Sequence, residues 1–234
     1  DFKPQELSNT AWAFATLDEG DPALLRAVTR SALARLAGFQ PEELSALVWS
    51  AARLHAGEGR LLQAAADVAL AEVHAFGPRE LASFAWAFAA LGEDAPELMH
   101  GLAREAASKM ARFRPRDLSN LAWAFATLNL VSEDLLAVLA RTARTRLEEL
   151  GLRELAELSW AFAVLGARDF DLFGAIAGIL PVKLAAINVH EAVAAGYTER
   201  LSGLVRDVTG IVWAFQFAHV LTGDVLRPVR AWLK

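Results

Sequence analysis

The sequence contains no cysteine among its 234 residues. This absence excludes a disulfide-stabilised scaffold and any zinc site with thiolate ligands, and it fits a reducing compartment. An excess of positive charge is lacking too, because 28 acidic residues against 23 lysines and arginines give a formal net charge of −5. That balance argues against a strongly basic nucleic-acid-binding protein.

Long uncharged apolar runs are also missing. No stretch reaches the roughly 18 residues of a membrane-spanning helix, and the nearest, residues 208–223, contains Gln216 and His219. No signal or transit peptide is recognisable at the start of the sequence. Apolar residues nevertheless make up 55% of the chain against 22% charged residues, so burial of a folded core is expected and general disorder is not.

Motifs for catalysis are absent as well. The five histidines are scattered, and His190-Glu191 lacks the second histidine of the zinc-protease spacing. We find no phosphate-cradling glycine loop, nucleophile elbow or Walker lysine. The sequence therefore predicts a protein that is not an enzyme, with no catalytic residue, no metal and no cofactor.

What the sequence does contain is one segment repeated at a constant spacing. Residues 7–17 return at 44–54, 81–91, 118–128 and 155–165, and the tryptophan of each copy follows the previous one by 37 residues: Trp12, Trp49, Trp86, Trp123 and Trp160. A fixed period of about 20–50 residues is typical of stacked supersecondary units. A sixth copy, around Trp213, follows Trp160 after 53 residues.

Each copy is expected to begin a pair of helices. Proline stands eight residues before the tryptophan in the first four copies, where it suits the first turn of a helix. Leu7, Ala11 and Phe14 then recur at helical spacing. A turn leads to a second helix, for which Asp21, Ser132 and Asp169 are expected to be N-caps or first-turn residues. The fold class predicted is all-α, an α-solenoid of stacked helix–turn–helix repeats with five regular 37-residue units plus an atypical C-terminal cap.

Three segments follow from this pattern. Residues 1–184 are predicted to form the five-repeat α-solenoid, residues 185–200 an insertion that is partly helical, and residues 201–234 a degenerate sixth repeat with the C-terminal cap. Pro181 is expected to interrupt the second helix of the fifth unit. The tryptophan and phenylalanine of each Trp-Ala-Phe triplet are both expected in the core between units, an interpretation that we favour over direct stacking on bases.

The repeated consensus resembles known families. Pro-x-Glu-Leu-Ser-Asn-x-Ala-Trp-Ala-Phe-Ala-x-Leu, as it stands at residues 4–17 and, with Asp117 for the glutamate, at 115–128, resembles the octotricopeptide and heptatricopeptide repeats. The resemblance covers residues 2–184, and the spacing is closer to the heptatricopeptide type. It implies a helical-repeat protein of mitochondria or plastids whose partners are organellar RNA or protein subunits of an organellar assembly. The RAP domain that follows the repeats in many members is not recognisable here.

The expected binding surface is the face of the first helices opposite Leu7, Ala11 and Phe14. The residue three positions before each tryptophan varies between units, and a protein that recognises one base per unit needs short polar side chains at such a place. An ordinary solvated helix surface is the alternative interpretation. The base-facing candidates are Asn9, Thr16, Arg53, Ser83, Asn120, Thr127 and Glu157, and the phosphate candidates, seven residues before a tryptophan, are Arg79, Arg116 and Arg153.

Two functions remain open at this point. Binding of single-stranded RNA along the first helices is favoured by the arginine row and by the family resemblance. A non-catalytic protein-binding scaffold, or a peripheral subunit of a ribosome or of a photosynthetic or respiratory assembly, is favoured by the negative charge and by the small number of units. In that case apolar residues such as Ala124, Ala161 and Val164 would contact the partner protein.

Overall fold

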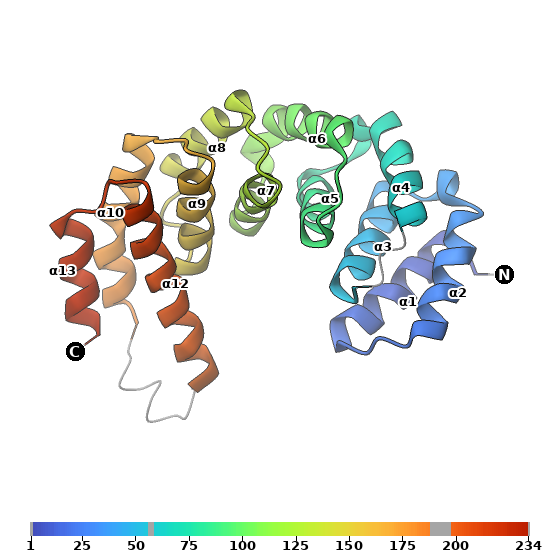
Figure 1. Ribbon diagram of the computed structural model, residues 1–234, viewed down its shortest axis with the longest axis horizontal. Helices are drawn as coiled ribbons and strands as arrows, with labels where there is room; N and C mark the ends of the chain where they lie inside the picture. The colour runs from blue at the N-terminus through green and yellow to red at the C-terminus, as the bar shows by residue number, and fades with distance from the viewer. Residues whose placement is uncertain (1, 56–58, 188–197, 234) are drawn as a thin grey trace. The chain divides into compact units, whose positions relative to one another are not determined.

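The computed structural model describes residues 2–55, 59–187 and 198–233, and the regular elements in these ranges are all helices (Figure 1). The predicted all-α class is therefore confirmed. The chain forms two compact units, residues 1–128 and 129–234. Within the described ranges, none of the helices combines the length and apolar character that crossing a membrane requires.

Unit 1 (residues 1–128) consists of two layers of helices. The first helices of the sequence copies pack side by side in chain order, and the second helices form a second layer against them (Figure 1). The first layer contains α1 (Pro4–Leu17), α3 (Pro41–Arg53), α5 (Pro78–Leu91) and α7 (Pro115–Thr127). The second contains α2 (Pro22–Leu33), α4 (Gly59–Ala71) and α6 (Pro96–Lys109), which the one-turn 3-10 helices η1 (Leu36–Gly38), η2 (Val73–Ala75) and η3 (Met110–Arg112) connect to the next first helix.

Unit 2 (residues 129–234) has the same two-layer arrangement. Its first layer contains α9 (Leu152–Val164) and α12 (Thr198–Phe217), which pack against each other. Its second layer contains α8 (Glu133–Thr145), α10 (Phe170–Ala185) and α13 (Gly223–Trp232). The sixth sequence copy thus forms the pair α12 and α13. Of the predicted insertion at 185–200, residues 188–197 lie outside the described residues.

A proline and a carboxylate that recur in the sequence copies define where the first helices begin. Proline occupies the first turn of α1, α3, α5 and α7, where its missing N–H removes no helical hydrogen bond. An acidic side chain two residues later accepts a hydrogen bond from the backbone N–H that precedes the helix, which is one half of a capping box. These bonds are Lys3 to Glu6 (2.7 Å), Gln40 to Glu43 (2.9 Å), Arg114 to Asp117 (3.3 Å) and, before α9, Gly151 to Glu154 (3.0 Å).

The second helices were predicted less completely. Asp21 and Asp169 cap α2 and α10 as expected, each accepting a backbone N–H at 2.8 Å. Ser132 stands at the N-cap position of α8, but its side chain makes no capping bond. The expected interruption at Pro181 was wrong, since α10 continues through this residue to Ala185. Leu180 and Leu184 are buried on both sides of the proline, and their burial outweighs one lost helical hydrogen bond.

A basic residue near the end of the second helix of a pair donates hydrogen bonds to backbone carbonyls just before the first helix of the same pair. The Lys109 ammonium donates to the backbone carbonyls of His74 and Phe76, both at 2.7 Å. Its side chain is 19% exposed and also pairs with Glu105 at 2.7 Å. The same sequence position makes equivalent bonds in other copies, from Arg35 to the Phe2 carbonyl and from Lys183 to the Glu148 carbonyl, each at 2.7 Å.

Candidate ligand-binding face

One side of each first helix in unit 1 remains accessible to solvent. In α5 it consists of Arg79, Ser83, Trp86 and Ala90, whose spacing of four, three and four residues keeps them on one helical stripe. None of the corresponding residues in the other first helices of unit 1 is buried. We call these sixteen residues the tryptophan face: Gln5, Asn9, Trp12 and Thr16 on α1; Glu42, Ala46, Trp49 and Arg53 on α3; Arg79, Ser83, Trp86 and Ala90 on α5; Arg116, Asn120, Trp123 and Thr127 on α7.

The prediction that the repeated tryptophans are buried was wrong. Trp12 is 46% exposed and Trp213 45% exposed, and the four between them are half-buried. The phenylalanine two residues later is the core residue instead, with Phe88 only 2% exposed. At about 100° per residue, positions two apart lie on nearly opposite sides of a helix, so one core cannot bury both rings.

Three of the four tryptophans of unit 1, on α3, α5 and α7, form a ladder across neighbouring helices. The ring centroids of Trp49 and Trp86 are 6.3 Å apart with an interplanar angle of 36°, and those of Trp86 and Trp123 are 6.1 Å apart at 31°. Partly exposed aromatic rings of this kind are platforms on which nucleic-acid bases stack. The sequence analysis favoured burial of the tryptophans over stacking on bases, although the helical spacing of the triplet separates the tryptophan from the phenylalanine.

The base-facing candidates of unit 1 all lie on the tryptophan face. Asn9, Ser83 and Asn120 have side chains without hydrogen-bond partners in the described part of the chain, so their polar groups are free for a ligand. Thr127 is exposed and equally unpartnered there. Two candidates are already engaged: the Thr16 hydroxyl donates to the Trp12 carbonyl at 2.8 Å, and Arg53 lies 3.9 Å from Asp18.

The phosphate candidates differ in their availability. Arg79 and Arg116 are exposed in unit 1, and their guanidinium groups have no partner among the described residues. Arg153 in unit 2 donates to Glu157 at 2.8 Å, one turn further along α9. This bond raises the pKa of Arg153 above its ordinary value. A phosphate at Arg153 would compete with Glu157, which already accepts from Arg153 through one carboxylate oxygen.

Unit 2 continues the pattern with a more apolar composition. Its two first helices carry Arg153, Glu157, Trp160 and Val164 on α9, and Arg206, Gly210, Trp213 and Phe217 on α12. Trp213 and Phe217 stack at 5.0 Å with an interplanar angle of 17°, and Phe217 is 53% exposed. Arg206 was missed as a phosphate candidate, although it stands seven residues before Trp213, as Arg79 stands before Trp86.

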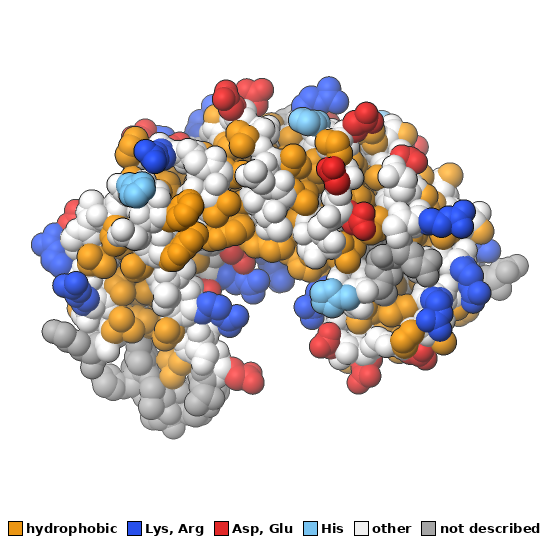
Figure 2. All heavy atoms as spheres, viewed as in Figure 1, with side chains coloured by type: hydrophobic (Ala, Val, Ile, Leu, Met, Phe, Trp, Pro, Cys, Tyr) orange, Lys and Arg blue, Asp and Glu red, His pale blue; other side chains and the backbone are white. Residues whose placement is uncertain are grey.

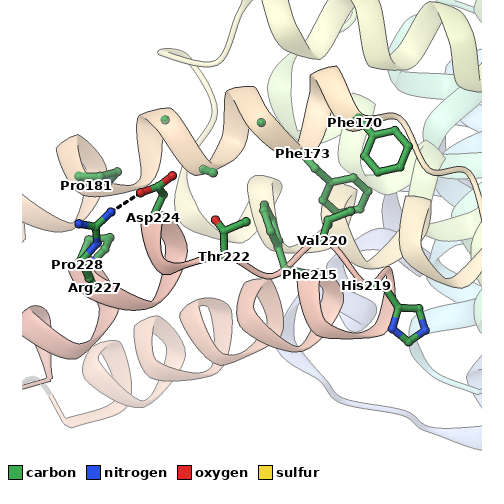
Figure 3. A pocket seen from close by; sticks show the side chains of 13 residues that line it. Phe170, Phe173, Pro181, Phe215, His219, Val220, Thr222, Asp224, Arg227 and Pro228 are labelled. Atoms are coloured by element: carbon green, nitrogen blue, oxygen red, sulfur yellow. Dashed lines mark hydrogen bonds and ion pairs between the residues drawn. The ribbon is translucent and has the colours of Figure 1, made fainter.

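A groove of about 780 Å³ lies between α10 and α13 in unit 2 (Figure 3). Phe173 of α10 and Phe215 of α12 meet edge to face in it at 4.9 Å, and Phe170 at its rim is 68% exposed. The two oppositely charged lining residues, Asp224 and Arg227, pair with each other (Figure 3). The groove therefore offers apolar contacts and no free charge from this pair.

Fold and face together define the class, which is an all-α protein of repeated helix pairs with a row of partly exposed tryptophans on its first helices. No family model matches the sequence, and no curated protein matches it.

Proposed function

We propose that the protein binds single-stranded RNA along the tryptophan face, as an α-solenoid in which each first helix contributes one base-contacting position. The observation that supports this most directly is the ladder of partly exposed indole rings on α3, α5 and α7, with Ser83 and Asn120 three residues before two of its tryptophans. Proteins that recognise single-stranded RNA combine aromatic stacking platforms with polar side chains directed at the base edges.

The spacing of the ladder suits unstacked bases. Neighbouring rings at 6.1 and 6.3 Å are almost twice as far apart as the rise of roughly 3.4 Å per nucleotide along the axis of a stacked DNA strand. A strand with one base per tryptophan is therefore stretched, and its bases separate from one another. Separated bases present their hydrogen-bonding edges to the residues three positions before each tryptophan.

The negative net charge of the whole chain does not describe the local charge of the tryptophan face. On the tryptophan face of unit 1, Arg53, Arg79 and Arg116 stand against Glu42, and with Asp18, which pairs with Arg53, the local net charge is +1. On the side of the molecule in Figure 2, acidic and basic side chains are interspersed without a continuous basic area. Because charges are screened over about 8 Å at physiological salt, the arginines nearest the strand outweigh the acidic residues elsewhere.

The family resemblance adds to this proposal a cellular location and a class of RNA ligand. It supports a location in a mitochondrion or plastid and an organellar transcript as ligand. A fluorescent fusion of the complete natural protein tests the location, and a uniform cytosolic distribution would contradict it.

A protein-binding scaffold is the second candidate, and one observation favours it. On the face of unit 2, Val164, Trp213 and Phe217 form an apolar area with two strongly exposed rings, and tryptophan is enriched in protein–protein hot spots. Of the apolar contact residues expected for a partner, Ala124 and Ala161 are buried, so Val164 alone is left accessible. A peripheral role in an organellar complex would use this area.

RNA binding is tested by fluorescence anisotropy with a randomised single-stranded RNA pool at two salt concentrations. The variant with Arg79, Arg116 and Arg153 changed to alanine should bind all sequences more weakly. Its salt slope should be flatter by about 1.4, because two free arginines each lose about 0.7 while Arg153 is already paired with Glu157. No measurable binding by the parent protein, or an unchanged slope in the variant, would favour the scaffold.

Base recognition is tested separately at Asn120. An asparagine amide that contacts a base with two hydrogen bonds discriminates by about 1–3 kcal/mol. Asn120→Ala should therefore relax the preference at one position of the bound sequence and leave the others unchanged. Selection from the pool with parent and variant measures this, and identical selected sequences would exclude Asn120 from base contact.

A further inference from the structure

A second concentration of free arginines lies in unit 1, at the amino-terminal ends of α5 and α7. There the segments around η2 and η3 enclose a hollow of about 720 Å³, lined among others by Arg79, Arg112 and Arg114. All three side chains are exposed, and their guanidinium groups have no hydrogen bond or ion pair within the described ranges. Three guanidinium groups therefore line one space without a hydrogen bond or ion pair among the described residues.

Two of the acidic residues that line this hollow are directed at the backbone. Asp117 is nearly buried and accepts the backbone N–H of Arg114 at 3.3 Å. Glu80 folds back against Gly77, where a Cβ would stand 2.5 Å from its carboxylate. Glu42 is left as the exposed carboxylate at the rim. The charged residues that line the hollow are thus four basic ones, Lys109 included, against three acidic ones, a net charge of +1.

The arginines are a local feature and not a consequence of the repeat. One period earlier, Arg112 and Arg114 correspond to Ala75 and Gly77, and one period later to Glu149 and Gly151. The helix pairs form with those residues as well, so the fold does not need arginine at these positions. A ligand with negative charge at this one place accounts for them better than packing does.

We propose that this hollow binds a phosphate group of the strand that crosses the tryptophan face, an inference that rests on the function proposed above. Guanidinium groups match phosphate oxygens with paired hydrogen bonds. Arg79 belongs to both sites, because it lines the hollow and lies seven residues, about 10 Å along the helix axis, before Trp86. Bases lie on the tryptophans, and the backbone passes over the amino-terminal ends of α5 and α7, which fixes the register of the strand.

The test uses the variant Arg112→Gln with Arg114→Gln, whose changes lie outside the tryptophan face. In the anisotropy assay it should bind RNA several-fold more weakly, with a salt slope flatter by about 0.7 for one lost phosphate contact. The control variant Arg26→Gln with Arg30→Gln removes the same charge from two exposed, unpartnered arginines of α2 and should match the parent. Parental affinity and slope in the Arg112/Arg114 variant would overturn the proposal while leaving RNA binding intact.

A second measurement separates the hollow from RNA binding itself. Titration of the parent with inorganic tripolyphosphate should shift the backbone amide NMR signals of Gly77, Arg79, Glu80, residues 112–114 and Arg116, and the Arg112/Arg114 variant should lose these shifts. If tripolyphosphate binds there but RNA does not, the proposed function fails and the hollow remains a site for another phosphate compound. If neither binds, both proposals fall.

Discussion

Two aromatic residues in every first helix except α3, a tryptophan and the phenylalanine two positions later, have different environments. Phe88 is enclosed by its own unit and stacks on Phe84 at 5.4 Å, whereas Trp86 keeps part of its ring in contact with water. At the scale of single residues, the phenylalanine therefore contributes mainly to stability, and the tryptophan has surface left for a ligand.

Substitution of these two residues should separate stability from binding. Phe88→Ala should lower the free energy of unfolding by about 3–5 kcal/mol, the usual range for a buried phenylalanine. Trp86→Ala should cost less stability, since its ring is partly solvated, but should weaken RNA binding by about 1–3 kcal/mol for one stacked base. Urea denaturation followed by circular dichroism, with the anisotropy assay, measures both. Equal losses of stability would contradict the assignment.

A second residue-scale prediction concerns Asp207 on α12. Partial burial raises the pKa of this carboxyl above its ordinary value, against the opposing influence of Arg153 and Arg206. Because the pKa is higher in the folded state, the protonated form favours folding, and that contribution is lost as the pH rises through the folded-state pKa. Asp207→Asn should therefore melt at a higher temperature than the parent at pH 7.

The difference in melting temperature should shrink as the pH falls toward 4, where the parent carboxyl is increasingly protonated. Asp94→Asn, at an exposed carboxylate in unit 1, is the matched control for the loss of one negative charge. A constant offset between Asp207→Asn and the parent over the whole pH range would show that burial of the charge is not the cause.

At the scale of helices, the ends of the second helices carry part of the stability. Lys109 holds two backbone carbonyls at the start of α5 as well as Glu105, and a hydrogen bond that involves a charged group contributes about 1.5–3 kcal/mol. Lys109→Met should lower the free energy of unfolding by about that amount, measured by urea denaturation. No loss of stability would show that water replaces the ammonium group without cost.

The second copy offers the converse experiment. Glu72 occupies the position that corresponds to Lys109 and cannot donate to a carbonyl. Glu72→Lys should place an ammonium group near the equivalent carbonyl at Phe39 and raise the stability. A decrease would mean that the bond depends on the local geometry around α6 and not on the repeated position.

Helix positions were the part of the fold that the sequence predicted best. Proline and the acidic residue behind it act within one turn, so their effect is local and visible in the chain. Pro181 was misjudged because burial of Leu180 and Leu184 is a tertiary effect that local rules omit. The tryptophans were wrongly predicted as buried for the same reason. Helical spacing shows which residues share one side of a helix, but which side faces solvent depends on the packing of neighbouring helices.

The candidate site was predicted in part for a similar reason. Asn9, Ser83 and Asn120 could be found because they share a fixed position in the repeat. Arg112 and Arg114 lie in the connection between helices, where no helical period applies. They meet Arg79 only because η2 and η3 bring two sequence copies together.

At the scale of the whole molecule, the two units have separate aromatic cores. Phe84 and Phe88 lie in unit 1, and Phe173 and Phe215 in unit 2. Because repeats are coupled mainly to their neighbours, Phe88→Ala should accelerate amide hydrogen exchange in residues 41–91 well before residues 152–185. Phe215→Ala is the reciprocal variant. Equal acceleration in both units from either change would show one cooperative structure.

The tryptophan ladder also has an optical consequence. Indole rings 6.1 and 6.3 Å apart, inclined by 31° and 36°, are close enough for their electronic excitations to couple. Light absorbed by one ring is shared with its neighbours on α3, α5 and α7, so the three rings act as a single chromophore with a chiral arrangement. The near-ultraviolet circular dichroism of the protein should therefore contain a contribution that depends on the distance and angle between these three rings, beside that of the other four tryptophans.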